Sequence, residues 1–180
     1  MKKKKKQLTL LLLAVIGIPA FLMCVIFGGL VLLVTITIPH QMIGNSMDPA
    51  LGDGEFVLGK EVSLDQIERG DIIVYRSKRG VDFVHRVVGL PGDKLEIKEG
   101  ILYINGGRES KEHFEKSHSL FGDDFIGKDC GGDMAVTVVP EGYVFVMGDN
   151  RKNSMDSRFL GPVKESAISD RIFLCYWNCR

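Results

Sequence analysis

Residues 71–89 read DIIVYRSKRGVDFVHRVVG, and this stretch indicates the fold class of the chain. Two runs rich in Val, Ile and aromatic residues, 71–77 and 81–89, are separated by the turn-forming segment 78–80. Side chains of this kind, interrupted by turn signals, are typical of β-strands. Helical periodicity is nearly absent after residue 40, so the stretch predicts two strands within a mainly β domain.

Similar runs recur on both sides of this stretch. We expect further strands at 55–60, 94–98, 100–106, 134–139, 143–148 and 171–177, and one helical turn within 63–70. The sequence LPGD at 90–93 predicts a type II turn, because proline presets φ at its first central position and glycine permits positive φ at the second. The polar, Gly-rich segment 106–133 is expected to be a long loop or an insertion between strands.

The N-terminus has a different composition from the rest. Five consecutive lysines at 2–6 precede the run 8–39, which carries no charged residue. An apolar helix of about 20 residues spans a bilayer, whereas the apolar core of a cleaved signal peptide has only ~7–15 residues. We therefore predict a transmembrane anchor over 8–39 that is not cleaved. The positive-inside rule places the basic tail 1–7 in the cytoplasm and the domain 40–180 outside it.

Charge and cysteine content limit the classes of function. Lys+Arg and Asp+Glu are balanced at 23 each, which argues against a nucleic-acid-binding protein. Cys24 lies in the predicted anchor, and Cys130, Cys175 and Cys179 lie in a compartment where a disulfide is allowed. The pairing among these three stays open. The spacing of CYWNC at 175–179 suits neither a zinc pair nor a redox motif, so we expect no metal and no cofactor.

A histidine in the second strand is the first candidate for chemistry. Strand alternation places His85 on one face with Val81, Phe83 and Val87. His85 is therefore either a core histidine with a local hydrogen bond or a buried catalytic base. A serine hydroxyl becomes a nucleophile when such a base takes its proton, and a carboxylate can orient the base.

Ser46 in GNSMDPAL (44–51) and the polar segment MGDNRKNSMDSRFLG (147–161) offer a serine and two carboxylates, Asp149 and Asp156. Together with His85 they contain the parts of a hydrolytic triad. Sequence spacing leaves open which carboxylate would meet the histidine.

Four segments in order resemble the conserved blocks of type I signal peptidases. They are GNSMDPAL (44–51), RGDIIVYR (69–76), HRVVGLPGDKLEIKEGILYING (85–106) and GDNRKNSMDSRFLGPV (148–163). The resemblance covers most of residues 40–177. It implies a single-pass serine endopeptidase of the cell membrane, with a catalytic domain of twisted antiparallel sheets. Its partners would be the lipid bilayer and exported preproteins, whose N-terminal signal peptides it removes after small residues.

The resemblance also implies roles for individual residues. Ser46 corresponds to the nucleophile and His85 to the general base, a position where most bacterial relatives have lysine. Asp156 is the carboxylate expected to orient His85, and Ser154 matches a serine that hydrogen-bonds the base. The Ser46 N–H would be the main oxyanion donor. The expected structural support of the site comes from Gly44, Arg86, Asp149 and Arg158. Met47 is expected to be either an apolar contact near the membrane or a core methionine.

Burial of His85 and a nearby Asp156 would shift the pKa of the imidazole in opposite directions. We therefore expect a pKa near the ordinary value of about 6.5. Three alternatives stay open: a processing peptidase of the same superfamily with a pilin or conjugation substrate, an inactive homologue, and a membrane-anchored binding protein without catalysis. The last of these predicts that Ser46→Ala leaves function intact.

Overall fold

The structure is a computed structural model that describes residues 13–114, 122 and 124–179. The chain divides into two units, residues 1–37 and 38–180.

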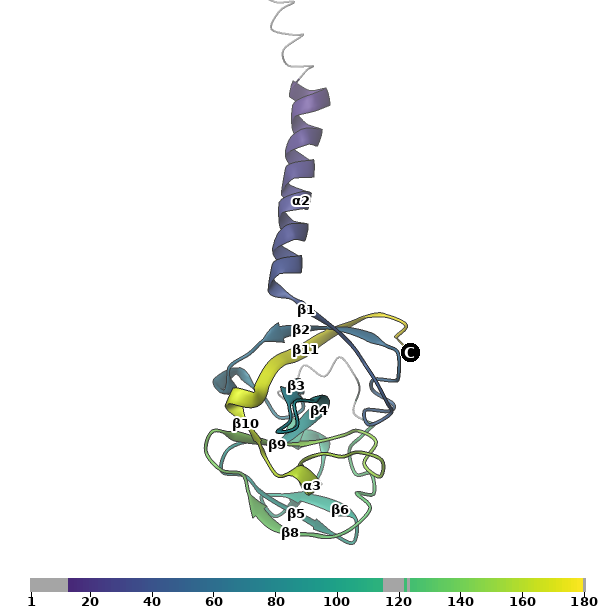
Figure 1. The fold of residues 1–180 in the computed structure, drawn as a ribbon, viewed down its shortest axis with the longest axis vertical. Helices are drawn as coiled ribbons and strands as arrows, with labels where there is room; N and C mark the ends of the chain where they lie inside the picture. The colour runs from purple at the N-terminus through teal and green to yellow at the C-terminus, as the bar shows by residue number, and fades with distance from the viewer. Residues whose placement is uncertain (1–12, 115–121, 123, 180) are drawn as a thin grey trace, which may run out of the picture. The chain divides into compact units, whose positions relative to one another are not determined.

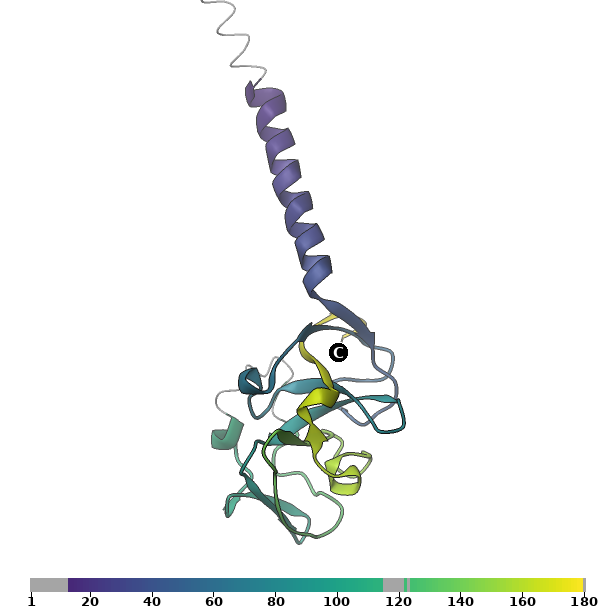
Figure 2. The same ribbon diagram turned by 60° about the vertical axis from the view of Figure 1, so that its left-hand side comes forward.

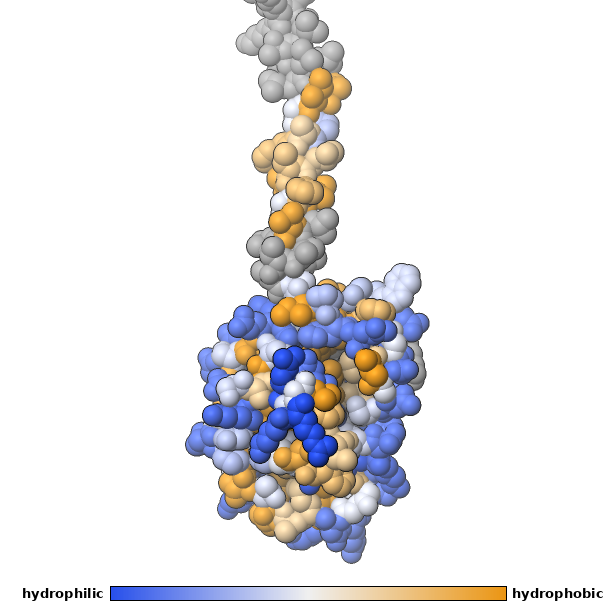
Figure 3. All heavy atoms as spheres, in the orientation of Figure 1, coloured by the Kyte–Doolittle hydropathy of each residue, from blue (hydrophilic) through white to orange (hydrophobic). Residues whose placement is uncertain are grey.

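The first unit is helical. A π-helical turn, η1 (Leu13–Gly17), leads into α2 (Ile18–Ile36), and Pro19 lies in the first turn of α2, where a missing N–H costs little. Large apolar side chains such as Phe21 and Met23 are exposed along it. Figure 3 shows that spheres in the hydrophobic colours predominate on the described part of this helix. Of the residues that the structure describes, no helix is long and apolar enough to cross a membrane, so the anchor expected over 8–39 is not confirmed.

The second unit consists of two antiparallel sheets (Figures 1 and 2). The larger contains, in spatial order, β1 (Ile38–Gln41), β2 (Phe56–Glu61), β11 (Ile168–Trp177), β3 (Ile72–Arg76), β4 (Asp82–Gly89), β9 (Tyr143–Met147) and β10 (Val163–Lys164). The smaller contains β7 (Gly107–Arg108), β6 (Ile101–Ile104), β5 (Lys94–Lys98) and β8 (Met134–Val138). The short helical elements are η2 (Leu64–Gln66), η3 (Lys111–Phe114), α3 (Ser157–Leu160) and η4 (Glu165–Ala167). The prediction of a mainly β, antiparallel domain is confirmed.

The expected strands are all present, and the turn at 90–93 has the expected geometry. Gly92 has φ +85°, and the Asp93 N–H donates to the Leu90 carbonyl over 3.0 Å. Three short strands, β1, β7 and β10, were not predicted. β1 begins at Ile38, within the apolar run, and pairs in register with β2. A strand that contains Pro39 has a weak sequence signal, and only the pairing with β2 defines it.

The core lies on both faces of the larger sheet. Along β3, Ile72 and Val74 belong to one buried cluster, whereas Ile73 and Tyr75 belong to another on the opposite face. This explains why the strand is a continuous apolar run rather than an alternating one. Each fully buried aliphatic side chain of this kind contributes about 1.5–3 kcal/mol to folding.

Part of the segment 106–133 packs against the core instead of forming an exposed loop. Phe114, Phe125 and Cys130 join the cluster that also holds the apolar side chains of the smaller sheet. Glu109 forms a buried ion pair with Arg151 at 2.6 Å, which attaches this segment to the loop after β9. Positions 115–121 and 123 lie outside the described residues.

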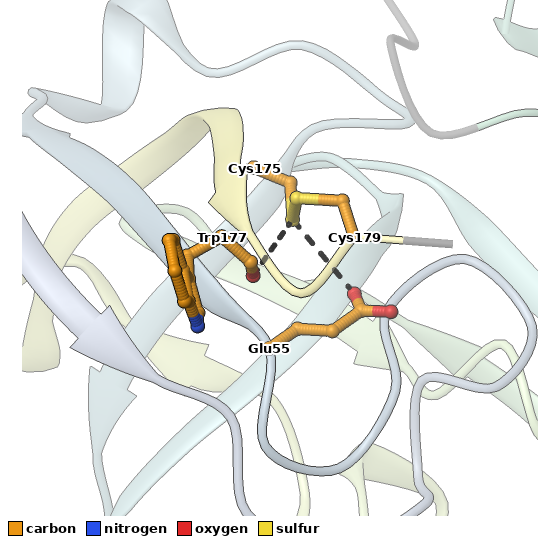
Figure 4. The surroundings of a disulfide bond; sticks show 4 residues. All are labelled: Glu55, Cys175, Trp177 and Cys179. Carbon is orange, nitrogen blue, oxygen red and sulfur yellow. Dashed lines mark hydrogen bonds between the residues drawn. A yellow bond between two sulfur atoms is a disulfide. The ribbon is translucent and has the colours of Figure 1, made fainter.

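The structure pairs Cys175 with Cys179 in a disulfide near the C-terminus (Figure 4). The Cys175 sulfur lies 3.9 Å from a carboxylate oxygen of Glu55, the buried residue that precedes β2. Cys130 is free and buried, and burial raises the pKa of its thiol. Cys130 is therefore the unpaired one of the three cysteines in the second unit.

Candidate active site

Ser46 lies in a turn at 46–50 between β1 and β2, and its side chain is partly exposed. Two hydrogen bonds join this turn to the loop that follows β9. The Asn150 N–H donates to the Ser46 carbonyl over 3.0 Å, and the Asn150 side-chain amide donates to the Asn45 carbonyl over 2.9 Å. The first and fourth of the segments that the sequence singled out are therefore in direct contact.

Gly148 is the point at which these two segments approach most closely. A Cβ atom at this position would meet the Ser46 carbonyl oxygen and the Ser154 hydroxyl, and it would lie 2.6 Å from Ser154 Cβ. Real Cβ atoms essentially never come closer than 3.0 Å to another heavy atom. Glycine is thus required here, because a side chain at this position would not fit between the Ser46 carbonyl oxygen and the Ser154 side chain.

His85 reaches the same place from β4. Its side chain is 1% exposed, and its Nε2 lies 3.2 Å from Ser154 Oγ. β4 pairs with β9 so that Arg86 is opposite Met147, which puts His85 beside the residue where the loop begins, Gly148. The structure therefore brings the Ser46 carbonyl group and the side chains of His85 and Ser154 to the surroundings of Gly148 from three distant parts of the chain.

The second ring nitrogen of His85 has a partner that sequence reasoning missed. The Tyr75 hydroxyl lies 2.9 Å from His85 Nδ1, and both residues are buried. The register of β3 and β4 pairs Ile73 with His85 and Tyr75 with Phe83, so the tyrosine reaches His85 diagonally. Phe83 also stacks on the imidazole, with ring centroids 5.7 Å apart. Strand alternation places Ile73 and Tyr75 on the same face of β3. The contact of Tyr75 with His85 also depends on the register of β3 against β4, which the sequence does not specify.

Asp156 is the N-cap of α3 and is fully buried. It accepts hydrogen bonds from the Gly148 N–H (2.9 Å), from Arg158 Nε (2.8 Å) and Nη2 (2.7 Å), and from the Ser154 side chain. Burial by itself would raise the pKa of Asp156, but these hydrogen bonds lower it, so the group is a carboxylate. The expected direct contact with His85 is corrected: the hydrogen bonds that the structure gives His85 go to Tyr75 and Ser154, and Asp156 meets it through Ser154.

Burial dominates the electrostatics of His85. It lowers the pKa of the imidazole to about 4, although Asp156 and Asp149 act in the opposite direction. The expectation of a value near 6.5 is therefore wrong. The main reason is that burial disfavours the imidazolium more than the two carboxylates favour it, and Arg158, which pairs with Asp156, disfavours it further. At neutral pH the imidazole is uncharged and can accept a proton.

Besides the Glu109–Arg151 pair, the ion pairs Arg86–Asp149 and Arg158–Asp156 are buried and support the loop after β9. Arg86 binds both Asp149 oxygens, at 2.8 and 2.7 Å, and both side chains are 1% exposed. Arg158 donates to the carbonyl oxygens of Cys130 (2.8 Å) and Arg151 (2.6 Å). These contacts connect the loop to β4 and to the segment before β8.

Gly44 and Met47 flank the candidate nucleophile. Gly44 has φ +88°, which favours glycine, and its N–H donates to Asp53 over 2.7 Å. Met47 is fully buried in the cluster that contains Leu51 and Val57. Of the two roles expected for Met47, this burial agrees with that of a core methionine. Within the described residues, no group of His, Cys, Asp and Glu side chains could hold a metal ion.

The family model and two sequence relatives indicate the same family. The family model "Signal peptidase, peptidase S26" matches residues 13–177. Signal peptidase I of Bacillus licheniformis is 41% identical over 123 residues, which cover 67% of this chain and 65% of that protein, just under two thirds of its length. Signal peptidase IB of Staphylococcus aureus (strain COL) is 34% identical over 150 residues, which cover 79% of this chain and 78% of that protein. The crystal structure of a signal peptidase I from Enterococcus faecalis V583 is 31% identical, covers 60% of this chain and 97% of that one, and superposes with a TM-score of 0.47.

Proposed function

Since the chain belongs to the signal peptidase family, peptidase S26, we propose that it is a serine endopeptidase that removes N-terminal signal peptides from exported preproteins. One observation carries the mechanism. The buried, neutral His85 directs Nε2 at Ser154, and the Ser46 turn lies across Gly148 from the same serine. This geometry supports Ser46 as nucleophile and His85 as general base.

In the first step, Ser46 Oγ forms a bond to the scissile carbonyl carbon while its proton passes to His85 Nε2. The carbonyl electrons move to oxygen, and the Ser46 N–H is the donor that we assign to this oxyanion. The Gly44 N–H is not assigned to it, because that group is bound to Asp53. While the imidazole is neutral, the Ser154 hydroxyl donates to Nε2. Once Nε2 carries the new proton, the hydroxyl turns to donate to Asp156, and its oxygen accepts the hydrogen bond from Nε2.

In the second step, the C–N bond breaks and the imidazolium gives its proton to the departing amine. An imidazolium whose pKa is about 4 is a strong acid for this purpose. Water then attacks the acyl-Ser46 ester, with neutral His85 again acting as the base. The cleaved signal peptide leaves with a new carboxylate, and Ser46 regains its proton.

The remaining candidate residues hold the loop after β9 in place. Arg86 and Asp149 hold its start, and Asp156 with Arg158 holds the turn that carries Ser154. We propose that these four residues support the site without contacting the substrate. Met47 also supports the site, because its buried side chain attaches the turn that contains Ser46 to the core.

We further propose that the uncharged run that begins at residue 8 anchors the chain as a single pass and ends before β1, with the lysine-rich tail in the cytoplasm and the catalytic domain outside. This part rests on the uncharged run and the five lysines of the sequence. It would place the enzyme in the same bilayer as its substrates. Protease added outside intact spheroplasts should then digest the domain from residue 40 onward, and complete protection would exclude this topology.

The activity is tested by incubating the detergent-solubilised full chain with a preprotein that has Ala at −3 and −1. We expect one cleavage, after the −1 residue, as identified by N-terminal sequencing of the product. Ser46→Ala should give no product, and a bulky −1 residue in the substrate should prevent cleavage by the wild type. Cleavage by Ser46→Ala at the wild-type rate would exclude Ser46 as the nucleophile.

A further inference from the structure

Tyr75 contacts the ring nitrogen of His85 that a carboxylate contacts in a Ser-His-Asp triad. Its hydroxyl lies 2.9 Å from Nδ1, a normal hydrogen-bond distance, while the Nε2 contact with Ser154 is longer, at 3.2 Å. The tyrosine is 3% exposed, and its ring stacks on Phe83, which in turn stacks on His85. The position of the hydroxyl is therefore fixed by packing on adjacent strands.

The two carboxylates that influence His85 are both bound to arginines. Asp156 is paired with Arg158, and Asp149 binds Arg86 through both oxygens. The remaining hydrogen bonds that the structure gives Asp156 come from the backbone N–H groups of Gly148 and Arg158 and from the Ser154 side chain. Ser154 is next to Nε2 of His85 and not next to Nδ1. In the described part of the chain, the hydrogen bond at Nδ1 is thus supplied by a phenol rather than by a carboxylate.

We propose that Tyr75 is the positioning residue of His85. Its hydroxyl oxygen accepts the Nδ1 proton, which leaves the Nε2 lone pair directed at Ser154 and the Ser46 turn. This inference rests on the proposed role of His85 as the general base, because a base must carry its single ring proton on the nitrogen that faces away from the nucleophile.

A phenol in this position has a specific chemical consequence. When Nε2 takes the Ser46 proton, the imidazolium carries protons on both nitrogens, and the Tyr75 oxygen accepts the one on Nδ1. Burial raises the pKa of Tyr75, so the phenol keeps its own proton and stays neutral throughout. It orients the ring as a carboxylate would, but it adds no negative charge that would make the resting imidazole more basic.

The tautomer can be observed directly by 15N NMR of the full chain in detergent, labelled at histidine. The chain has four histidines, and the His85→Ala variant assigns the signals of His85. We expect a protonated Nδ1 and an unprotonated Nε2 at neutral pH in the wild type. A wild-type ring with its proton on Nε2 would overturn the proposal.

Tyr75→Phe keeps the stacked ring and removes only the hydroxyl. We expect kcat to fall by about 10- to 100-fold with KM unchanged, within the contribution of a well-placed general base, together with a shift of the His85 15N signals towards the other tautomer. The matched control is Tyr143→Phe in β9, a partly buried tyrosine that packs against a different cluster. Equal kcat for the two variants, with unmoved His85 signals, would contradict the proposal.

Circular dichroism of Tyr75→Phe shows whether the variant folds. If it does not, the wild-type tautomer decides the proposal by itself. Failure of the proposed function is a different result: wild-type cleavage by Ser46→Ala would remove the nucleophile but would leave the NMR measurement of the His85–Tyr75 hydrogen bond unaffected.

Discussion

Replacing Gly148 by alanine tests the central feature of the site, the approach of Ser46 and Ser154 around one glycine. The alanine Cβ would lie 2.6 Å from Ser154 Cβ and closer still to the Ser154 hydroxyl and the Ser46 carbonyl oxygen. Ordinary contact begins at 3.4 Å, so one of these groups must move by about 0.8 Å or more. Because the Ser46 group is backbone and Ser154 is bound to His85 and Asp156, neither can move without disturbing the site.

The size of the effect follows from this displacement. A shift of about 1 Å in a catalytic group can reduce the rate by about 100-fold, and overpacking of a buried position costs about 1–3 kcal/mol of stability. We therefore expect kcat/KM of Gly148→Ala to fall by about 100-fold or more on a peptide with Ala at −3 and −1. Unfolding of the variant in urea should show a loss of stability within the overpacking range.

Gly132→Ala is the matched control. Gly132 has no heavy atom within 4 Å of an ideal Cβ and no positive φ, so alanine is accommodated there. Its kcat/KM and stability should be close to those of the wild type. If Gly148→Ala retains activity within about threefold of Gly132→Ala, the two serines do not meet as described and the proposed geometry is wrong.

Two further predictions concern stability. Asp149→Asn leaves the buried Arg86 without its carboxylate and should lower the free energy of unfolding by about 3–5 kcal/mol; the same change at the exposed Asp82, which pairs with Arg76, should have little effect in urea unfolding. His85 should make the folded state less stable in acid, because its folded pKa of about 4 lies below the value of about 6.5 in the unfolded chain. The unfolded chain then binds more protons, so stability is full above about pH 6.5 and falls by up to about 3 kcal/mol as the pH decreases to 4; an unchanged pH dependence in His85→Ala would contradict this assignment.

The strands could be predicted from the sequence because their signals are local. Alternation, β-branched residues and the turns at Gly80 and Gly92 all lie within a few residues of the strands that they delimit. β1 was missed because Ile38 and Pro39 continue the apolar run of the N-terminus, and only hydrogen bonds to β2 make them a strand. The disulfide was left open because three cysteines allow three pairings.

The sequence identified most of the candidate residues of the site, but not the hydrogen bonds between them. Ser46, His85 and Ser154 were all named as candidates; His85 contacts Ser154 in the structure, and the Ser46 carbonyl group lies beside the same glycine as Ser154. The Tyr75 hydrogen bond depends on the register of β3 against β4, which sequence patterns do not specify. The pKa of His85 depends on a balance between burial, which lowers it, and the neighbouring charges. Only the structure gives this balance, since it shows how deeply His85 is buried and that Arg158 pairs with Asp156, the carboxylate expected to raise the pKa.

The most direct test of a neutral, buried histidine acting as base on Ser46 is the pH dependence of kcat/KM for the wild type and His85→Ala, measured on the same preprotein. For the wild type we expect a plateau from neutral pH down to about pH 5 and an acidic limb with an apparent pKa near 4, the value of the free enzyme. His85→Ala should lose this limb together with nearly all activity. Wild-type activity in His85→Ala, with the acidic limb unchanged, would show that another group accepts the Ser46 proton.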